Sequence, residues 1–164
     1  MTMAGEVDAA ARKLEETTIA DDASGVETNP THEGSGMTLN ERLELALTIA
    51  EECIQPNELR MLLEKKPTPV CYDGFEPSGR MHIAQGVFKA MNVNRCLAAG
   101  GTFVFWVADW FALMNDKMGG DLAKIRDVGN YLVEVWRAAG MRMDRVEFRW
   151  ASDEICRRGD EYWP

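Results

Sequence analysis

The stretch YDGFEPSGRMHIAQG, residues 72–86, decides the fold of this chain. The apolar run Pro69-Val70-Cys71 before it is typical of a buried strand, and we predict a strand over about residues 69–75. Glu76-Pro77-Ser78-Gly79 predicts a turn, and His82 then stands at the start of a run with helical spacing. A strand, a turn of small residues and a helix N-terminus form a natural phosphate cradle, because free backbone N–H groups and the helix dipole point at the anion. A histidine there can donate a hydrogen bond or a proton to a phosphate.

Helical and strand patterns alternate after this stretch. The next helix is indicated by Val87, Ala90, Met91, Leu97 and Ala98, and Gly100-Gly101 ends it. Residues 102–108 are apolar throughout, which is typical of a strand buried on both faces in the middle of a parallel sheet. This strand ends at Asp109, at the sheet edge where ligands bind in open α/β folds.

The remaining patterns supply a second crossover helix and a third strand. We predict a short helix over Trp110–Met114 and a long one that Asp121 caps. The apolar stripe of the long helix consists of Leu122, Ile125, Val128, Leu132, Val135, Trp136 and Ala139, and Gly140 closes it. Alternation over Val146–Trp150 predicts a strand, and Ser152-Asp153-Glu154 opens a last helix. The order β-α-β-α-β-α predicts an α/β fold with a doubly wound, right-handed parallel sheet, of which three strands are about half.

The N-terminal part of the chain divides into an acidic tail and a helical pair. Residues 1–37 contain eight acidic and two basic residues, a net charge of −6, and no aromatic residue. Such a segment cannot bury enough apolar surface to offset the entropy of ordering, so we predict a disordered tail. The segment 38–66 begins with a Thr-Leu-Asn-Glu capping box. This pattern predicts a helix over about residues 39–53, followed by a short helix that starts at Pro56.

Composition restricts the class of protein further. At 164 residues and 46% hydrophobic, the chain fits about one domain with a sizeable core. No apolar run reaches the roughly 18 residues of a membrane span, and the first residues lack the pattern of a secretory signal. Residues 38–164 carry nineteen acidic and sixteen basic residues, so they offer no overall basic surface for gripping nucleic acid. We therefore expect a cytosolic chain that binds no membrane.

The cysteines and histidines indicate no metal site. Cys53, Cys71, Cys96 and Cys156 form no C-x-x-C pair, and the two histidines lie far apart. We expect four reduced core thiols, because free cysteine usually behaves as a small apolar residue in a cytosolic protein.

Neither of two common nucleotide-binding patterns is present. There is no G-x-G-x-x-G and no G-x-x-x-x-G-K-[ST]. Instead residues 77–85 read P-S-G-R-M-H-I-A-Q, which resembles the H-I-G-H signature region of class I aminoacyl-tRNA synthetases. Three longer stretches resemble the eukaryotic cytosolic tyrosyl-tRNA synthetases, and those of plants above all: residues 72–86, FVFWVADWFALMNDKMGG (103–120) and DEYWP (160–164). The resemblance covers about residues 38–164 and assigns residues 67–164 to the first half of the catalytic domain.

The resemblance implies a fold, a reaction and partners. The fold is the Rossmann-like nucleotide-binding fold of class I synthetases, here incomplete. The reaction is tyrosine–tRNA ligation, in which tyrosine and ATP form tyrosyl-adenylate and pyrophosphate before the tyrosyl group passes to tRNA. ATP is a substrate that Mg²⁺ accompanies, without a protein-bound metal site. The full-length enzyme is expected to be a cytoplasmic homodimer that binds L-tyrosine, ATP and tRNA(Tyr).

By position in the signature, the resemblance assigns four residues to ATP binding. His82 matches the first histidine, which contacts the phosphates, and Gln85 stands where the second histidine would be. Both are assigned catalytic roles, although a glutamine donates through its amide and cannot carry charge. Ser78 and Gly79 match the turn that approaches the phosphates. Ala84 departs from the family pattern, because it replaces the glycine that lets adenine lie close to the backbone.

The tyrosine subsite is assigned in the same way. Tyr72 matches a strand tyrosine whose hydroxyl meets the phenol of the substrate, and Gly74 leaves room beside the backbone. Ala108 and Asp109 lie at the pocket end of the second strand. Asp109 is equally suited to capping the helix that begins at Trp110.

Several parts of the family pattern have no counterpart in this sequence. These are the tyrosine-binding helix, the Lys-rich ATP loop and the anticodon-binding domain; Lys117-Met118-Gly119-Gly120 is not that loop. We therefore expect this chain alone to have little or no ligase activity. Two alternatives remain open: a tryptophan–tRNA ligase, whose family shares the P-S-G-x-x-H turn, and a non-catalytic synthetase-derived fragment.

Overall fold

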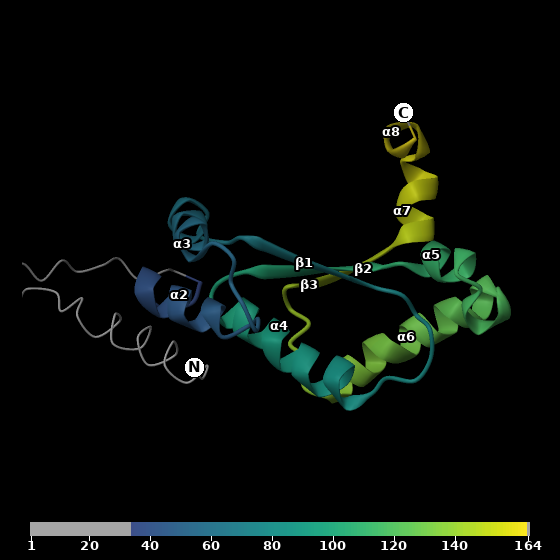
Figure 1. Cartoon of the computed structure of the whole chain (residues 1–164), viewed down its shortest axis with the longest axis horizontal. Coiled ribbons are helices and arrows are strands. Elements are labelled where there is room, and N and C mark those ends of the chain that lie inside the picture. The colour runs from purple at the N-terminus through teal and green to yellow at the C-terminus, as the bar shows by residue number, and fades with distance from the viewer. Residues whose placement is uncertain (1–33, 164) are drawn as a thin grey trace, which may run out of the picture.

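Three strands form one open parallel sheet in the computed structural model, which describes residues 34–163 (Figure 1). They are β1 (Val70–Phe75), β2 (Thr102–Val107) and β3 (Val146–Trp150). The order in the sheet is β1-β2-β3, so β2 is central, as its continuous apolar sequence predicts. The parallel α/β fold is therefore confirmed. The predicted disordered tail of residues 1–37 lies almost entirely outside the described residues.

Helices precede, connect and follow the strands. Before β1 come α2 (Leu39–Leu47) and α3 (Pro56–Lys65). Between β1 and β2 lie the π-helix η1 (Ala84–Phe88) and α4 (Lys89–Ala98). Between β2 and β3 lie α5 (Asp109–Met114), the 3-10 helix η2 (Lys117–Gly119) and α6 (Leu122–Ala138), and after β3 come α7 (Ala151–Arg157) and α8 (Gly159–Tyr162). No helix within residues 34–163 has both the length and the apolar composition of a membrane span.

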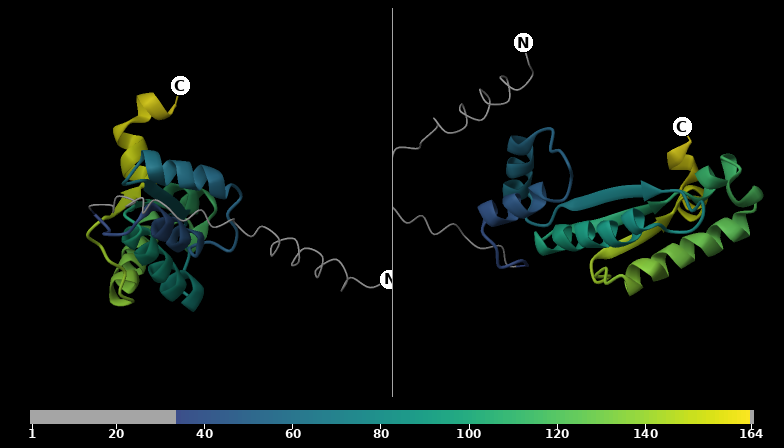
Figure 2. Two further views of the ribbon diagram at one scale, coloured as in Figure 1. Left: turned by 90° about the vertical axis from the view of Figure 1, so that its left-hand side faces the viewer. Right: turned by 60° about the horizontal axis from the view of Figure 1, so that its bottom comes forward.

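The core lies between one face of the sheet and the two crossover helices. Phe103, Phe105 and Val107 of β2 point to this face and are buried, and α4 and α6 cover it (Figure 2). From α6, the ring of Trp136 stacks on Phe105 with 4.8 Å between the ring centroids. Phe148 of β3 lies 5.2 Å from the Phe105 ring and 6.1 Å from the Trp136 ring, so the three rings form one cluster. This aromatic cluster removes apolar surface from water and so stabilises the packing of α6 on the sheet.

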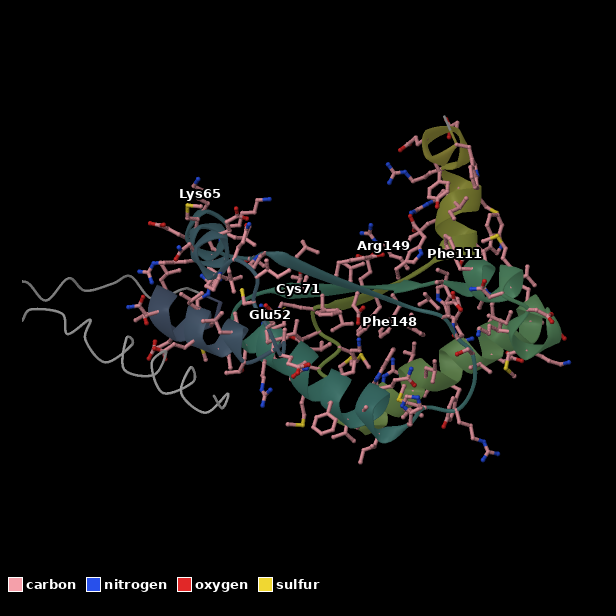
Figure 3. All side chains as sticks on the ribbon, viewed as in Figure 1. Glu52, Lys65, Cys71, Phe111, Phe148 and Arg149 are labelled. Atoms are coloured by element: carbon pink, nitrogen blue, oxygen red, sulfur yellow. The ribbon has the colours of Figure 1, made fainter. Side chains whose placement is uncertain are left out.

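The opposite face of the sheet is exposed over much of its area. Val70 and Tyr72 of β1 are each 67% exposed. In β2 only alternate residues are buried, so the prediction that β2 is buried on both faces is wrong for the described residues. Arg149 points to this open face, whereas its neighbour Phe148 points to the covered one (Figure 3). The predicted pattern was misleading because Trp106 is apolar in sequence yet only partly buried in the fold.

Helix α2 begins where the capping box predicts and ends earlier than expected. The Glu41 N–H donates to Thr38 Oγ1 (3.3 Å), and the Thr38 N–H donates to Glu41 Oε2 (2.7 Å). The helix stops at Leu47 rather than at residue 53, because Thr48 closes it and Ile49 packs against the core. An apolar stripe indicates the face of a helix and not its last residue.

Arg42 is the buried residue of α2, which the apolar stripe does not predict. Its side chain is 3% exposed. It donates hydrogen bonds to the carbonyls of Ala99 (2.6 Å), Leu63 (3.4 Å) and Pro67 (2.5 Å). Arg42 therefore joins α2 to the C-terminal ends of α3 and α4, and its burial is tolerated because each bond satisfies a donor.

The helix after the signature buries only part of the predicted apolar stripe. Gly86, Ala90 and Val93 are buried, whereas Val87 and Met91 are 44% and 43% exposed. Of the residues that indicate this helix, Ala90 and Leu97 are buried, whereas the expectation that Val87 and Met91 share their face is wrong. Two neighbouring faces of this helix are apolar, so spacing alone does not select the one that meets the sheet.

Helix α6 has the predicted start and end. Oδ1 of Asp121 accepts hydrogen bonds from the N–H groups of Ala123 (3.0 Å) and Lys124 (3.2 Å). Gly140, with φ of +86°, follows the helix in the left-handed region that glycine adopts without strain.

The four cysteines are free, but they are not all core residues. Cys96 is buried, Cys53 and Cys71 are partly exposed, and Cys156 is exposed. The expectation of four core thiols is therefore wrong for Cys156, which lies near the end of α7.

Candidate functional site

Tyr72 and Gly74 lie on the open face of β1, because alternate residues of a strand share a face. A Cβ built on Gly74 would stand 3.6 Å from the Tyr72 hydroxyl and 3.8 Å from the Cβ of Trp106. The phenol ring of Tyr72 therefore extends along the strand until its hydroxyl stands above Gly74. The hydroxyl has no hydrogen-bond partner within residues 34–163. The glycine leaves a bare patch of sheet beside this hydroxyl.

The turn that follows β1 is held from two sides. Pro77 is fully buried and packs against α6 at Gly129. A Cβ built on that glycine would lie only 3.3 Å from Cγ of the proline. From the loop after α5, Nδ2 of Asn115 donates to Glu76 Oε1 (2.7 Å). Gly79 has φ of +156°, a value that residues with a side chain rarely adopt. The turn is therefore anchored at Glu76 and Pro77, and its backbone conformation at residue 79 favours glycine.

Ser78, His82 and Gln85 are exposed on this turn and on the start of the following helix. The carbonyl of His82 accepts the N–H of Gly86 (2.9 Å), so the helix begins directly after the histidine. None of the three side chains has a hydrogen-bond partner within the part of the chain that the structure describes. The helix N-terminus and these three side chains are thus accessible to an anionic ligand.

The π-helical turn η1 carries Gln85 and is fixed by Trp136 of α6. The Trp136 Nε1 donates to the backbone carbonyl of Gln85 (2.7 Å). The indole is 2% exposed and meets the ring of Phe75 edge-on, with 4.9 Å between centroids. A π-turn interrupts the regular ladder of helical hydrogen bonds, and such turns recur at functional sites. Trp136 therefore ties the signature helix to the last residue of β1.

Asp109 is fully buried at the carboxyl end of β2. Its Oδ1 accepts the N–H groups of Trp110 (2.9 Å) and Ser152 (2.9 Å). Its Oδ2 accepts the Ser152 hydroxyl (2.5 Å) and Nη1 of Arg126 (3.3 Å). The carboxylate therefore caps the first turn of α7 and also meets the start of α5, so its acceptors are directed at the protein.

Arg126 continues this network to the surface. Its guanidinium pairs with Asp153 (3.0 Å) and lies over the ring of Trp150, 4.8 Å from the centroid. The hydrogen bond from Arg126 lowers the pKa of Asp153, and the same bond raises the pKa of Arg126. The network fixes α6 against α7 at the edge of the sheet where ligands bind.

Ala108 and a neighbouring cavity complete this edge. The Ala108 N–H donates to the carbonyl of Phe75 (2.9 Å), which ties the ends of β1 and β2 together. A cavity of about 270 Å³ lies on the open face, lined by Trp106, Arg149, Glu154, Ile155, Arg158, Glu161 and Tyr162. No predicted site residue lines it, but Trp106 is the register partner of Gly74. The cavity therefore adjoins the Tyr72–Gly74 patch.

The predicted site residues thus fall into three places. Tyr72 and Gly74 share the open face, the residues of the turn and helix start are exposed beyond the strand end, and Asp109 is buried. Sequence reasoning missed Trp106 and Trp136, which contact these groups from other elements. No group of three or more His, Cys, Asp or Glu side chains within residues 34–163 is arranged to hold a metal ion.

The sequence matches one protein family over most of the folded part. The family described as tRNA synthetases class I (W and Y) matches residues 64–157. Tyrosine–tRNA ligase 2, cytoplasmic, of Arabidopsis thaliana is 54% identical over 143 residues, which are 85% of this chain and 19% of that protein. Tyrosine–tRNA ligase 1, cytoplasmic, of the same plant is 59% identical over 126 residues, 77% of this chain and 33% of that protein.

The fold matches solved structures of the same kind. The Leishmania major tyrosyl-tRNA synthetase in complex with tyrosinol has a TM-score of 0.75 and 68% sequence identity, over 77% of this chain and 19% of that one. This chain therefore spans between 19% and 33% of the length of the relatives named here. The matched residues include β1, the turn, the signature helix and all of β2 and β3. The chain belongs to the class I tRNA synthetase family of the tryptophan and tyrosine type.

Proposed function

We propose that this chain supplies the tyrosine- and ATP-contacting N-terminal part of a tyrosine–tRNA ligase. The observation that carries the proposal is the position of Tyr72 above Gly74 on the open face of β1. The same strand leads directly into the exposed turn and the helix start that carry Ser78, His82 and Gln85. A substrate phenol bound on the strand and substrate phosphates bound at the helix start would meet near the end of β1. That is the arrangement an aminoacyl-adenylate requires.

Activation is the step to which these residues contribute. The carboxylate of tyrosine attacks the α-phosphate of ATP, a new C–O–P link forms and pyrophosphate leaves. Negative charge increases on the phosphates in the transition state, so hydrogen-bond donors placed there lower the barrier. We assign this role to His82 and Gln85, with Ser78 and Gly79 positioning the triphosphate. We expect the adenine to approach the helix at Ala84, in place of the family's glycine.

Selection of tyrosine follows from Tyr72. Tyr72 is exposed here, and the substrate ring would cover its hydroxyl on binding. A hydroxyl that is buried in this way and pairs with the substrate phenol rejects phenylalanine, since the analogue leaves polar groups unpaired; tyrosyl-tRNA synthetases are a standard illustration of this rule. Gly74 leaves the surface beside the hydroxyl open to the substrate ring. Ala108 and Asp109 form the wall at the carboxyl end of β2, with Asp109 acting through its hold on α7.

The partners of the whole enzyme belong to this proposal. ATP is a substrate that arrives with Mg²⁺ on its own phosphates, so no protein-bound metal site is required. The tyrosyl group passes to tRNA(Tyr), and the full-length enzyme acts as a homodimer. We place the protein in the cytoplasm, which is supported by the names of both Arabidopsis relatives, cytoplasmic tyrosine–tRNA ligases 1 and 2.

The test is calorimetric binding of a non-hydrolysable tyrosyl-adenylate analogue, with the tryptophanyl analogue measured beside it. We expect selective binding of the tyrosyl analogue and about tenfold weaker binding by Tyr72→Phe, which removes one hydrogen bond. Tyr131→Phe is the matched control, because Tyr131 lies on α6 and is 48% exposed. It should bind like the unmodified chain.

Two other results would contradict the proposal. Preference for the tryptophanyl analogue would assign the chain to the tryptophan branch of the family. Binding of neither analogue by the folded chain would favour a non-catalytic role for it.

A further inference from the structure

Two cysteines meet where β1 packs on α4. The Sγ atoms of Cys71 and Cys96 lie 2.8 Å apart, and both residues are free thiols. Cys71 lies on the side of β1 that faces α4, opposite the exposed Tyr72 (Figure 3). Cys96 belongs to the buried stripe of α4 and is 3% exposed. The pair therefore joins a partly exposed sulfur to a buried one across two elements of the core.

The surroundings hold the two sulfurs together. A Cβ built on Gly101 would lie 3.0 Å from the Cys96 Sγ and 3.2 Å from the Pro69 carbonyl, so no larger residue fits beside the pair. The backbone N–H of Gly101 donates to the Cys96 carbonyl (3.1 Å), which fixes the end of α4. Cys96, which is 3% exposed, has little room to turn away from Cys71. Disulfides form between cysteines that the backbone already presents to one another.

The two thiols also differ in acidity. Cys96 donates its S–H to the Cys71 sulfur, and this bond lowers the pKa of the Cys71 thiol. The same bond, together with burial, raises the pKa of Cys96 well above its usual range. Cys71 is thus the better nucleophile and, because it is partly exposed, also the more accessible sulfur.

We propose that Cys71 and Cys96 are an oxidisable pair, a modification site at which a peroxide converts the two thiols into a disulfide between β1 and α4. The Cys71 thiolate attacks one peroxide oxygen and the O–O bond breaks, which gives a sulfenic acid and hydroxide. The Cys96 sulfur then attacks the sulfenic sulfur, the S–O bond breaks and the S–S bond forms. Two thiols and one hydrogen peroxide give one disulfide and two waters.

The disulfide acts on the strand that carries the proposed tyrosine subsite. Cys71 directly precedes Tyr72, and Cys96 lies in α4, which continues directly from the π-helix η1 that carries Gln85. A bond between them closes a loop that contains the whole stretch of residues 72–86. The disulfide lowers the conformational entropy of the unfolded chain, so unfolding becomes less favourable. We therefore expect the oxidised protein to unfold at a higher temperature.

The test is mass spectrometry of the folded chain after treatment with hydrogen peroxide. Trypsin leaves Cys71 in the peptide of residues 66–80 and Cys96 in the peptide of residues 96–117. We expect these two peptides to appear as one linked species that lacks two hydrogen atoms and separates on reduction. Oxidation in urea should remove the preference for this pair, because the folded structure creates it.

Two variants sharpen the result. The double variant Cys53→Ser/Cys156→Ser should still give the linked species. Cys96→Ser should stop at the Cys71 sulfenic acid, which a sulfenic-acid-specific dione labels. The proposal is overturned if folded protein shows no linked species at a peroxide dose that oxidises the exposed Cys156, or if Cys71 links equally to Cys53 or Cys156.

Discussion

The indole Nε1 of Trp136 donates a hydrogen bond of 2.7 Å to the backbone carbonyl of Gln85, which lies 51 residues earlier in the chain. One partner is in the core, and the other carries an exposed side chain of the signature helix. The position of the proposed phosphate-contacting residues therefore depends on a residue that is remote from the ligand.

Replacing Trp136 with phenylalanine removes this hydrogen bond and shrinks the ring. We expect a loss of about 2 kcal/mol in the free energy of unfolding, from the lost bond and the space left in the aromatic cluster. We also expect faster amide exchange at Gly86 and Lys89, the N–H donors of η1 and its C-cap. Urea unfolding and hydrogen exchange measure the two effects. Trp163→Phe, at a residue that is 67% exposed, should change neither, and equal effects of both variants would refute the assignment.

Gly129 is a packing requirement of α6. A Cβ there would lie 2.5 Å from Cη2 and 2.9 Å from Cζ3 of Trp150, and Pro77 closes the other side. We expect Gly129→Ala to cost about 2–3 kcal/mol, because the indole also carries Arg126 and cannot retreat freely. The measurement is the midpoint of thermal unfolding. Gly159→Ala, where a Cβ meets nothing within 4 Å, is the control, and a neutral Gly129→Ala would show that the tryptophan does move.

Replacing Asp109 measures how much the buried hydrogen-bond network contributes to the free energy of unfolding. Asp109→Asn keeps the shape of the side chain but replaces one oxygen with an NH₂ group. Ser152 and Arg126 both donate to Asp109, so a donor would then face a donor. We expect a loss of about 3 kcal/mol in the free energy of unfolding. Asp153→Asn removes the exposed partner of the same arginine and should cost less than about 1 kcal/mol. Similar losses for the two variants in urea unfolding would contradict a special role for Asp109.

Acid should destabilise the chain through its paired carboxylates. The pKa values of five of them are lowered by hydrogen bonds in the folded state: Glu41, Asp121, Asp144, Glu147 and Asp153. A folded pKa below the unfolded one, about 4 for these groups, gives stability above that pH. This stability is lost as the pH falls through the lowered pKa.

We therefore expect the urea midpoint to fall below about pH 4 and to change little between about pH 7 and 5. Asp121→Asn keeps a good helix cap but has no carboxyl to protonate, so its midpoint should fall less steeply. A midpoint that drops mainly between about pH 7 and 5 would point to other groups.

The sequence predicts the local elements well, because their signals lie within a few residues. The capping box at Thr38, the cap at Asp121 and the alternation over Val146–Trp150 all appear in the fold at the predicted residues. The prediction is wrong where contacts with another element determine the outcome. Examples are the end of α2 at Leu47 and the exposure of Trp106. Periodicity describes one element and contains no information on what covers it.

The same limit applies to the candidate site. The residues of the 72–86 stretch were recognised because they are contiguous. Trp136 was expected only as an apolar residue of a helix, since no local pattern reveals an indole that donates to a carbonyl 51 residues away. The sequence permits two roles for Asp109, because the partner that decides between them, Ser152, lies 43 residues further along the chain.

The strand order β1-β2-β3 is the order of the strands along the chain. During synthesis, each new strand therefore finds its neighbour already complete, and the sheet can grow from one edge without waiting for a distant segment. A ribosome delivers roughly 5–20 residues per second, which is slow compared with the formation of a helix or a short loop. The stretch of residues 72–86 can thus be held by β2 and α4 before α6 has emerged. Trp136 then emerges and ties the signature helix to the core, before β3 completes the sheet and adds Phe148.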